Sequence, residues 1–226
     1  MNLNLKEWVN LKKQILKFSL LLMSIAFLFT SVDARAEMKA TQQKHCISSK
    51  EVKLQRSMSK LWIDHTIWTR SYIVSALSGL EDQNKVLERL LQNQVDIGNA
   101  IKPYYGDAAG NKLAGLLKEH ILIAGKVVEA AKSGNQENLK KFIAEWYKNA
   151  DDIALFLSKA NPYWPNNQLK ELLYTHLKLL TDQVVARIKK DWNAEIRAYD
   201  VGENHILKLA EALSKGIIKQ FPKKFK

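Results

Sequence analysis

Three histidines recur at nearly equal intervals in this chain of 226 residues. They are His65, His120 and His176, and the second interval is one position longer than the first. Imidazole nitrogens bind zinc, copper, iron and nickel, and they also hydrogen bond to small polar ligands. The repeated spacing makes these histidines the first candidates for a site.

A second set of polar residues recurs at a constant and slightly shorter interval: Asn99, Asp152 and His205. Residues equidistant from the turn of an antiparallel helical hairpin lie at the same height, because both helices rise by ~1.5 Å per residue. The midpoint of His65 and Asn99 is residue 82, and the other two pairs are centred near residues 136 and 190, all in or beside turn-forming stretches. We therefore expect these six side chains to form one polar layer across a helical bundle.

Such a layer predicts a site for a divalent transition metal or a small polar ligand. The expected metal ligands are His65, His120, His176, His205 and Asp152. The residues expected to orient these ligands, or to hold a small anion beside them, are Asp96, Asn99, Asp151, Asp200, Glu203 and Arg70.

A structural role for the same histidines stays open. A histidine on an apolar helix face is often a core residue hydrogen bonded to its neighbour, and duplicated hairpins inherit such residues together. The chain also contains no HExxH, CxxC or Glu-x-x-His motif.

Apolar residues at spacings of three and four predict helices through most of residues 51–221, and no stretch alternates as strands do. Turn-forming residues gather at 79–84, 103–110, 133–135, 161–167 and 189–193. These five breaks predict an all-α fold of six helices, arranged as a bundle of three repeated antiparallel hairpins.

The first 36 residues have the order of a secretory signal peptide. A lysine-rich flank precedes an apolar run at 18–29, and Ala34-Arg35-Ala36 follows it. The run is shorter than the ~20 residues of a membrane-spanning helix. We therefore expect an exported protein, extracellular or associated with the cell envelope. After cleavage it would have a flexible segment at 37–50, one helical-bundle domain at 51–222 and a basic tail at 223–226.

The formal net charge is +12, and the leader holds five basic and two acidic residues, so the mature chain retains +9. A basic exported protein favours anionic cell-envelope polymers or lipid head groups as partners. Recognition of a nucleic-acid sequence is not expected. The single cysteine, Cys46, excludes an internal disulfide, and we expect a monomer.

Common catalytic motifs are missing from the sequence. It has no GxSxG elbow, and the glycine-rich stretch 106–110 lacks the Lys-Ser pair of a nucleotide loop. Asp151 and Asp152 are neighbours on a predicted helix, so they point ~100° apart and do not suit a shared acid/base role. We expect a protein that is not an enzyme.

Five stretches resemble a family of small exported helical proteins from spore-forming, Bacillus-like Gram-positive bacteria. They are LWIDHTIWTRSYIVSAL, DIGNAIKPYYG, LLKEHILIAGKVVEAAKSGN, WYKNADDIALFLSKANP and DWNAEIRAYDVGENHILKLAEAL, and the similarity covers most of residues 50–222. Members of that family resemble proteins labelled glycosyltransferase or acetylglutamate kinase. Both labels imply α/β folds with nucleotide sites, and this sequence has neither feature.

Two functions follow from these patterns. One is a binding protein that holds a metal ion or a small polar ligand in its histidine layer. The other is a basic structural or interaction protein of the cell envelope with no ligand site.

Overall fold

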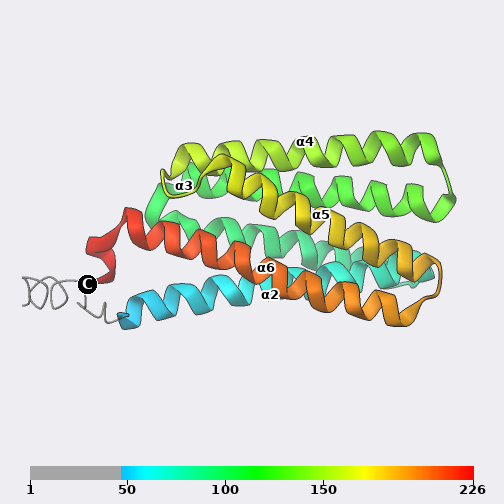
Figure 1. Cartoon of the computed structure of the whole chain (residues 1–226), viewed down its shortest axis with the longest axis horizontal. Coiled ribbons are helices and arrows are strands. Elements are labelled where there is room, and N and C mark those ends of the chain that lie inside the picture. The colour runs from blue at the N-terminus through cyan, green and yellow to red at the C-terminus, as the bar shows by residue number, and fades with distance from the viewer. Residues whose placement is uncertain (1–46) are drawn as a thin grey trace, which may run out of the picture. The chain divides into compact units, whose positions relative to one another are not determined.

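A computed structural model describes residues 47–226 of the chain (Figure 1). The leader expected at 1–36 and Cys46 lie outside these residues. The helices are α2 (Ser49–Ser78), α3 (Gln83–Ser133), α4 (Gln136–Ala160), α5 (Asn166–Ile188) and α6 (Trp192–Gln220), with a short 3-10 helix, η1 (Pro222–Phe225), at the end. No strand occurs in this part of the chain, so the predicted all-α class is confirmed.

The break expected at 103–110 is a kink inside α3, so residues 47–226 form five helices where six were expected. Gly106 has φ 82° and ψ 170°, outside the helical region, and Pro103 lies one turn before it. Proline supplies no amide hydrogen, and only glycine adopts a positive φ readily. Figure 1 shows the chain turning back at this point, so α3 has two arms that run side by side.

The two arms of α3 approach closely because the residues at their contact are small. A Cβ placed on Gly98 would lie 2.5 Å from the carbonyl oxygen of Gly110 and 2.8 Å from Cβ of Ala114. Real Cβ atoms do not come so near a backbone oxygen, so the contact requires glycine at position 98.

The three turns at one end of the bundle share one backbone geometry. Leu80 N donates to Ser75 O at 3.0 Å, Asn135 N to Ala130 O at 3.1 Å, and Asp191 N to Ala186 O at 3.0 Å. These bonds close each helix in the Schellman pattern, which needs a left-handed residue just before the donor. That residue is Gly79 (φ 66°), Gly134 (φ 71°) and Lys190 (φ 60°).

Both ends of the described chain are tied to the bundle. Ser48 and Glu51 form a capping box that starts α2, so the segment expected to be flexible at 37–50 already enters the helix at Ser49. The basic tail is also packed: Phe225 is buried, Lys224 Nζ donates to Pro103 O at 2.6 Å, and Lys50 Nζ donates to Lys226 O at 2.7 Å.

Every helix contributes to one main apolar core. A smaller apolar cluster lies nearer the three turns and includes Tyr72, Ile73, Leu90, Val128 and Val184. Among residues 47–226, no helix combines the length and the apolar character that a membrane span requires.

Lys190→Gly should stabilise the protein. A side chain in the left-handed region costs about 1 kcal/mol, and glycine removes that cost at φ 60°. Urea denaturation should give a free energy of unfolding higher by up to about 1 kcal/mol. Lys189→Gly is the matched control, because Lys189 is in the right-handed region and glycine should not stabilise it. Equal effects of the two substitutions would contradict the prediction.

Candidate functional site

The three repeated histidines line one cavity between the helices. The cavity has a volume of about 80 Å³, and His65, His120 and His176 reach it from α2, the second arm of α3 and α5. The other lining residues are nearly all apolar, among them Ile73, Val128, Trp146, Leu180 and Val184. No Asp, Glu or Cys is among them.

One hydrogen bond, repeated three times, positions these histidines. Asn93 Nδ2 donates to Leu61 O at 3.0 Å, Asn149 Nδ2 to Leu116 O at 3.2 Å, and His205 Nε2 to Leu172 O at 2.8 Å. Each acceptor lies four residues before a cavity histidine, so it also receives that histidine's backbone N–H within the helix. The donors Asn93, Asn149 and His205 are evenly spaced along the chain, at the interval that separates His120 from His176.

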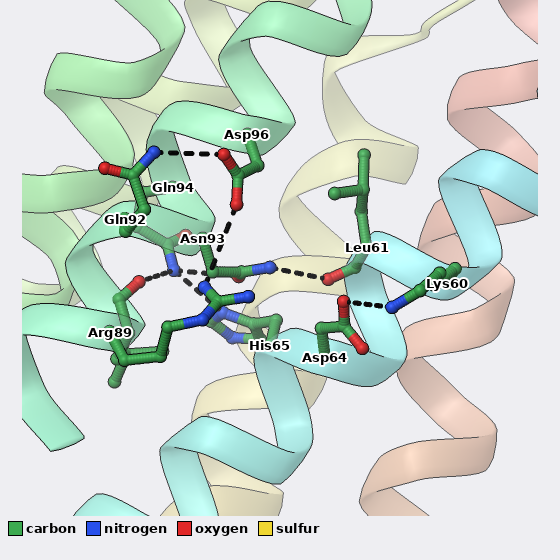
Figure 2. Close-up of polar contacts among 10 residues, drawn as sticks. Lys60, Leu61, Asp64, His65, Arg89, Gln92, Asn93, Gln94 and Asp96 are labelled. Carbon is green, nitrogen blue, oxygen red and sulfur yellow. Dashed lines mark hydrogen bonds and ion pairs between the residues drawn. The ribbon is translucent and has the colours of Figure 1, made fainter.

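Beside His65, the amide of Gln94 bears on which ring nitrogen carries the proton (Figure 2). Gln94 Nε2 donates to Leu90 O at 2.8 Å and to Asn93 Oδ1 at 3.1 Å, so this end of the side chain is its nitrogen. His65 Nδ1 lies 3.4 Å from the same nitrogen, whose two hydrogens face those two acceptors and which offers no electron pair to a donor. The tautomer of His65 that fits these contacts has its proton on Nε2.

The tautomer of His65 in turn determines the tautomer of His176. His65 Nε2 lies 3.4 Å from His176 Nε2, so His65 donates and His176 accepts. The proton of His176 is then on Nδ1. That atom is buried and has no hydrogen-bond partner among residues 47–226.

Beside His120, Asn149 both donates to the leucine carbonyl and accepts from the imidazole. Its Nδ2 is engaged by Leu116 O, so its Oδ1 accepts from His120 Nδ1 at 2.8 Å. His120 is therefore protonated on Nδ1, and its Nε2 carries a free electron pair.

The cavity histidines are neutral. Burial, and to a lesser extent the nearby His120, lower the pKa of His65 to about 3. Burial also lowers the pKa of His120 to about 4, although its bond to Asn149 acts in the opposite direction. The pKa of His176 lies well below its usual value, first because of burial and then because of the other histidines.

Three residues that line the cavity each carry a buried polar atom with no partner in the described chain: Thr69 Oγ1, Trp146 Nε1 and His176 Nδ1. The indole nitrogen and the protonated imidazole nitrogen can only donate, and the hydroxyl can donate as well. Buried donors are nearly always paired in proteins. The surface of the cavity is therefore apolar, with unpaired donors buried in three of the residues that form its wall.

Two of the five expected metal ligands lie elsewhere. Asp152 is exposed and pairs with Lys148 at 3.0 Å, one turn away on the same helix face. His205 is engaged by Leu172 O and does not line the cavity. Asn99, expected in the same layer, is exposed. The expectation of one six-residue polar layer is wrong for these three.

The residues expected to support the ligands are also engaged or displaced. Arg70 makes a two-pronged pair with the buried Glu195, at 2.9 Å for both contacts, and so is not aimed at the histidines. Asp96 pairs with Arg89, and Asp151 with Lys170 and Tyr174. Asp200 is exposed, and Glu203 lines a different small pocket.

Within residues 47–226, no group of three or more His, Cys, Asp or Glu is placed to hold a metal ion. The cavity that the three histidines share has no carboxylate in its lining, although His176 also borders the small pocket that Glu203 lines. Their arrangement suits an uncharged group better than a cation.

The sequence reading missed Asn93, Asn149 and Gln94. The signal that finds the two asparagines is the interval between His120 and His176. Asn149 precedes His205 by this interval, and Asn93 precedes Asn149 by the same interval. The shorter interval selected Asn99 and Asp152 instead, which lie on the outer faces of their helices. Gln94 carries no comparable signal, because the equivalent residues are Ala150 and Ile206.

Comparisons with protein-family models, curated proteins and solved structures found no match to this chain. The resemblance to a family of exported helical proteins therefore stays an expectation.

Stability should fall as the pH drops from about 6.5 toward 4, before most carboxylates titrate. The folded state holds His65 and His120 neutral at pKa values of about 3 and 4, while the unfolded chain binds protons near pH 6.5. The unfolded state thus binds more protons in this window, and each buried histidine contributes a loss of up to about 1.4 kcal/mol per pH unit. Urea denaturation at pH 7, 5.5 and 4.5 measures the slope. His120→Gln should make it shallower, and an unchanged slope would contradict the assignment.

Asn149→Ala should destabilise the protein strongly. It removes the donor to Leu116 O and leaves the Nδ1 proton of His120 buried without an acceptor. We expect a loss of about 2–4 kcal/mol in the free energy of unfolding. Asn99→Ala is the control and should change it by less than about 0.5 kcal/mol, because Asn99 is exposed. Similar losses in both variants would mean that the layer was placed correctly at Asn99.

Proposed function

We propose that this protein binds a small molecule, and that the part of the ligand inside the cavity is uncharged, largely apolar and equipped with a hydrogen-bond acceptor. The observation that carries the proposal is the set of unpartnered donors on Thr69, Trp146 and His176 around one cavity. A buried donor without a partner costs about 1–3 kcal/mol. An acceptor on a ligand would recover that cost.

Neutral imidazoles and an apolar wall together define the kind of ligand. A charged group would be poorly solvated in such a cavity, and no opposite charge lines it. A carbonyl, ether or hydroxyl oxygen fits the donors without that penalty. Small-molecule sites in general are mostly apolar, with a few polar groups that orient the ligand.

We also infer that the bundle consists of three copies of one hairpin, with the kink of α3 serving as the boundary between the first two. The repeated hydrogen bond at Asn93, Asn149 and His205 supports this reading. So do the left-handed turn residues at 79, 134 and 190, which have the same spacing as the three cavity histidines. A site where the three copies meet is then a natural place for one ligand. Export to the cell envelope rests on residues 1–36 and remains part of the proposal.

Straight-chain 1-alkanols from butanol to decanol are suitable probes, because each joins an apolar chain to one hydroxyl. At least one should bind measurably in calorimetry and raise the melting temperature of the full-length protein. Ala124→Leu should abolish this effect while leaving the fold intact, because Ala124 lines the cavity and a larger side chain fills it. Ala144→Leu, at an exposed position on α4, is the matched control.

Thr69→Val separates a specific site from general affinity for alkanols. It keeps the shape of the side chain and removes an unpartnered hydroxyl, so alkanol affinity should fall about tenfold, the equivalent of one hydrogen bond. Binding that survives both Ala124→Leu and Thr69→Val unchanged, or no binding by any alkanol, would overturn the proposed function.

A further inference from the structure

A basic groove lies at the turn end of the bundle, one helical turn beyond the cavity. It has a volume of about 320 Å³ and is lined by Leu77, Ser78, Lys132, Arg187, Ile188, Lys190 and Trp192. Three of these residues are cationic, and none is acidic. Ala131 and Val184 line the cavity, and Lys132 and Ile188 line the groove, so the two spaces are neighbours along α3 and α5.

The hairpins differ at several positions at this end, and both lysines of the groove are among them. Arg187 also stands where the other copies have Ala76 and Ala131, and Lys189, outside the groove, where they have Ser78 and Ser133. Lys132 stands where the other copies have Leu77 and Ile188, at the same spacing as the cavity histidines. Lys190 stands where the other copies have Gly79 and Gly134. Both departures from the repeat bring a positive charge to the same groove.

A role in helix capping accounts for only one of these lysines. Lys132 Nζ donates to Ala76 O at 2.7 Å, and a cation near the end of α2 offsets the helix dipole there. Lys190 makes no comparable bond among the described residues. It also adopts φ 60°, which glycine tolerates far better. Strained residues of this kind gather at functional sites.

Exposed apolar side chains connect the groove to the cavity. Val185 lines the cavity and is 41% exposed, and Ile188 lines the groove and is 42% exposed. They are three residues apart on α5 and therefore share one face. Trp192, 52% exposed, continues this surface, with the guanidinium of Arg187 5.6 Å from its ring centre.

We propose that the ligand is an anionic amphiphile whose apolar part enters the cavity and whose acidic head, of phosphate or carboxylate type, lies in the groove against Lys132, Arg187 and Lys190. This inference rests on the proposed function and adds the class of ligand. It places charge where cations and solvent are available, and keeps the neutral histidine region for uncharged atoms. The apolar surface at Val185 and Ile188 is covered by the same molecule.

The test compares three probes on the full-length protein by calorimetry. They are the best-binding 1-alkanol, the alkyl phosphate of the same chain length below its micelle concentration, and inorganic phosphate. The alkyl phosphate should bind about tenfold more tightly than the alkanol, and the difference should shrink with added salt. Inorganic phosphate should bind far more weakly than either.

Lys190→Gly supplies the variant, with Lys189→Gly as a control of equal charge outside the groove. Lys190→Gly should lose most of the preference for the alkyl phosphate, keep the affinity for the alkanol and remain as stable as the wild type or more so. Lys189→Gly should keep the preference.

The outcomes distinguish a failure of the amphiphile from a failure of the cavity ligand. Equal binding of alkanol and alkyl phosphate, or an equal loss in both lysine variants, would overturn the amphiphile while leaving the cavity ligand in place. Inorganic phosphate that binds as tightly as the alkyl phosphate would mean an anion site with no link to the cavity, which also overturns it. Failure of both chain-bearing probes would defeat the proposed function itself.

Discussion

The arrangement of the site depends on one contact, the side-chain hydrogen bond from the second helix of each hairpin to a leucine carbonyl of the first. Leu61 O, Leu116 O and Leu172 O each receive this bond and also lie four residues before a cavity histidine. The bond fixes the height of one helix against the other and the rotation of the first about its axis. Both must be right for three imidazoles from separate segments to reach one cavity.

Differences in how the three histidines are held give the cavity its chemistry. The first uses Asn93 as the clamp and Gln94 to set the proton of His65, and the second uses Asn149 for both tasks. In the third, His205 clamps Leu172 O and nothing beside it meets Nδ1 of His176. In a perfectly symmetrical bundle, the ring nitrogens of all three histidines would either all have hydrogen-bond partners or all lack them. The observed one leaves a single imidazole donor free.

The sequence predicted the helical class, the turns and the histidine trio, because apolar periodicity and turn residues are local signals. It could not predict the kink of α3 as part of one helix, since Pro103 and Gly106 read as a loop. The prediction of the residues that lie opposite the histidines was wrong for another reason. Height was estimated from intervals alone, and a shift of three residues turned Asn149 into Asp152 and moved the expected side chain from the core to the solvent. Rotation of a helix about its axis is set by packing, which intervals do not report.

The separation of charge along the bundle follows from the same geometry. The histidine layer is surrounded by helices, so burial lowers the pKa of His65, His120 and His176 and keeps the layer neutral. More than three turns further along, the helices end, and their terminal carbonyls attract cations such as Lys132. A charge is therefore well accommodated at the turns and costly at the histidines. Lys190 adds a positive charge at this end that helix capping does not require, at a backbone angle that favours glycine. The difference in charge between the turns and the histidine layer is therefore larger than the fold alone requires.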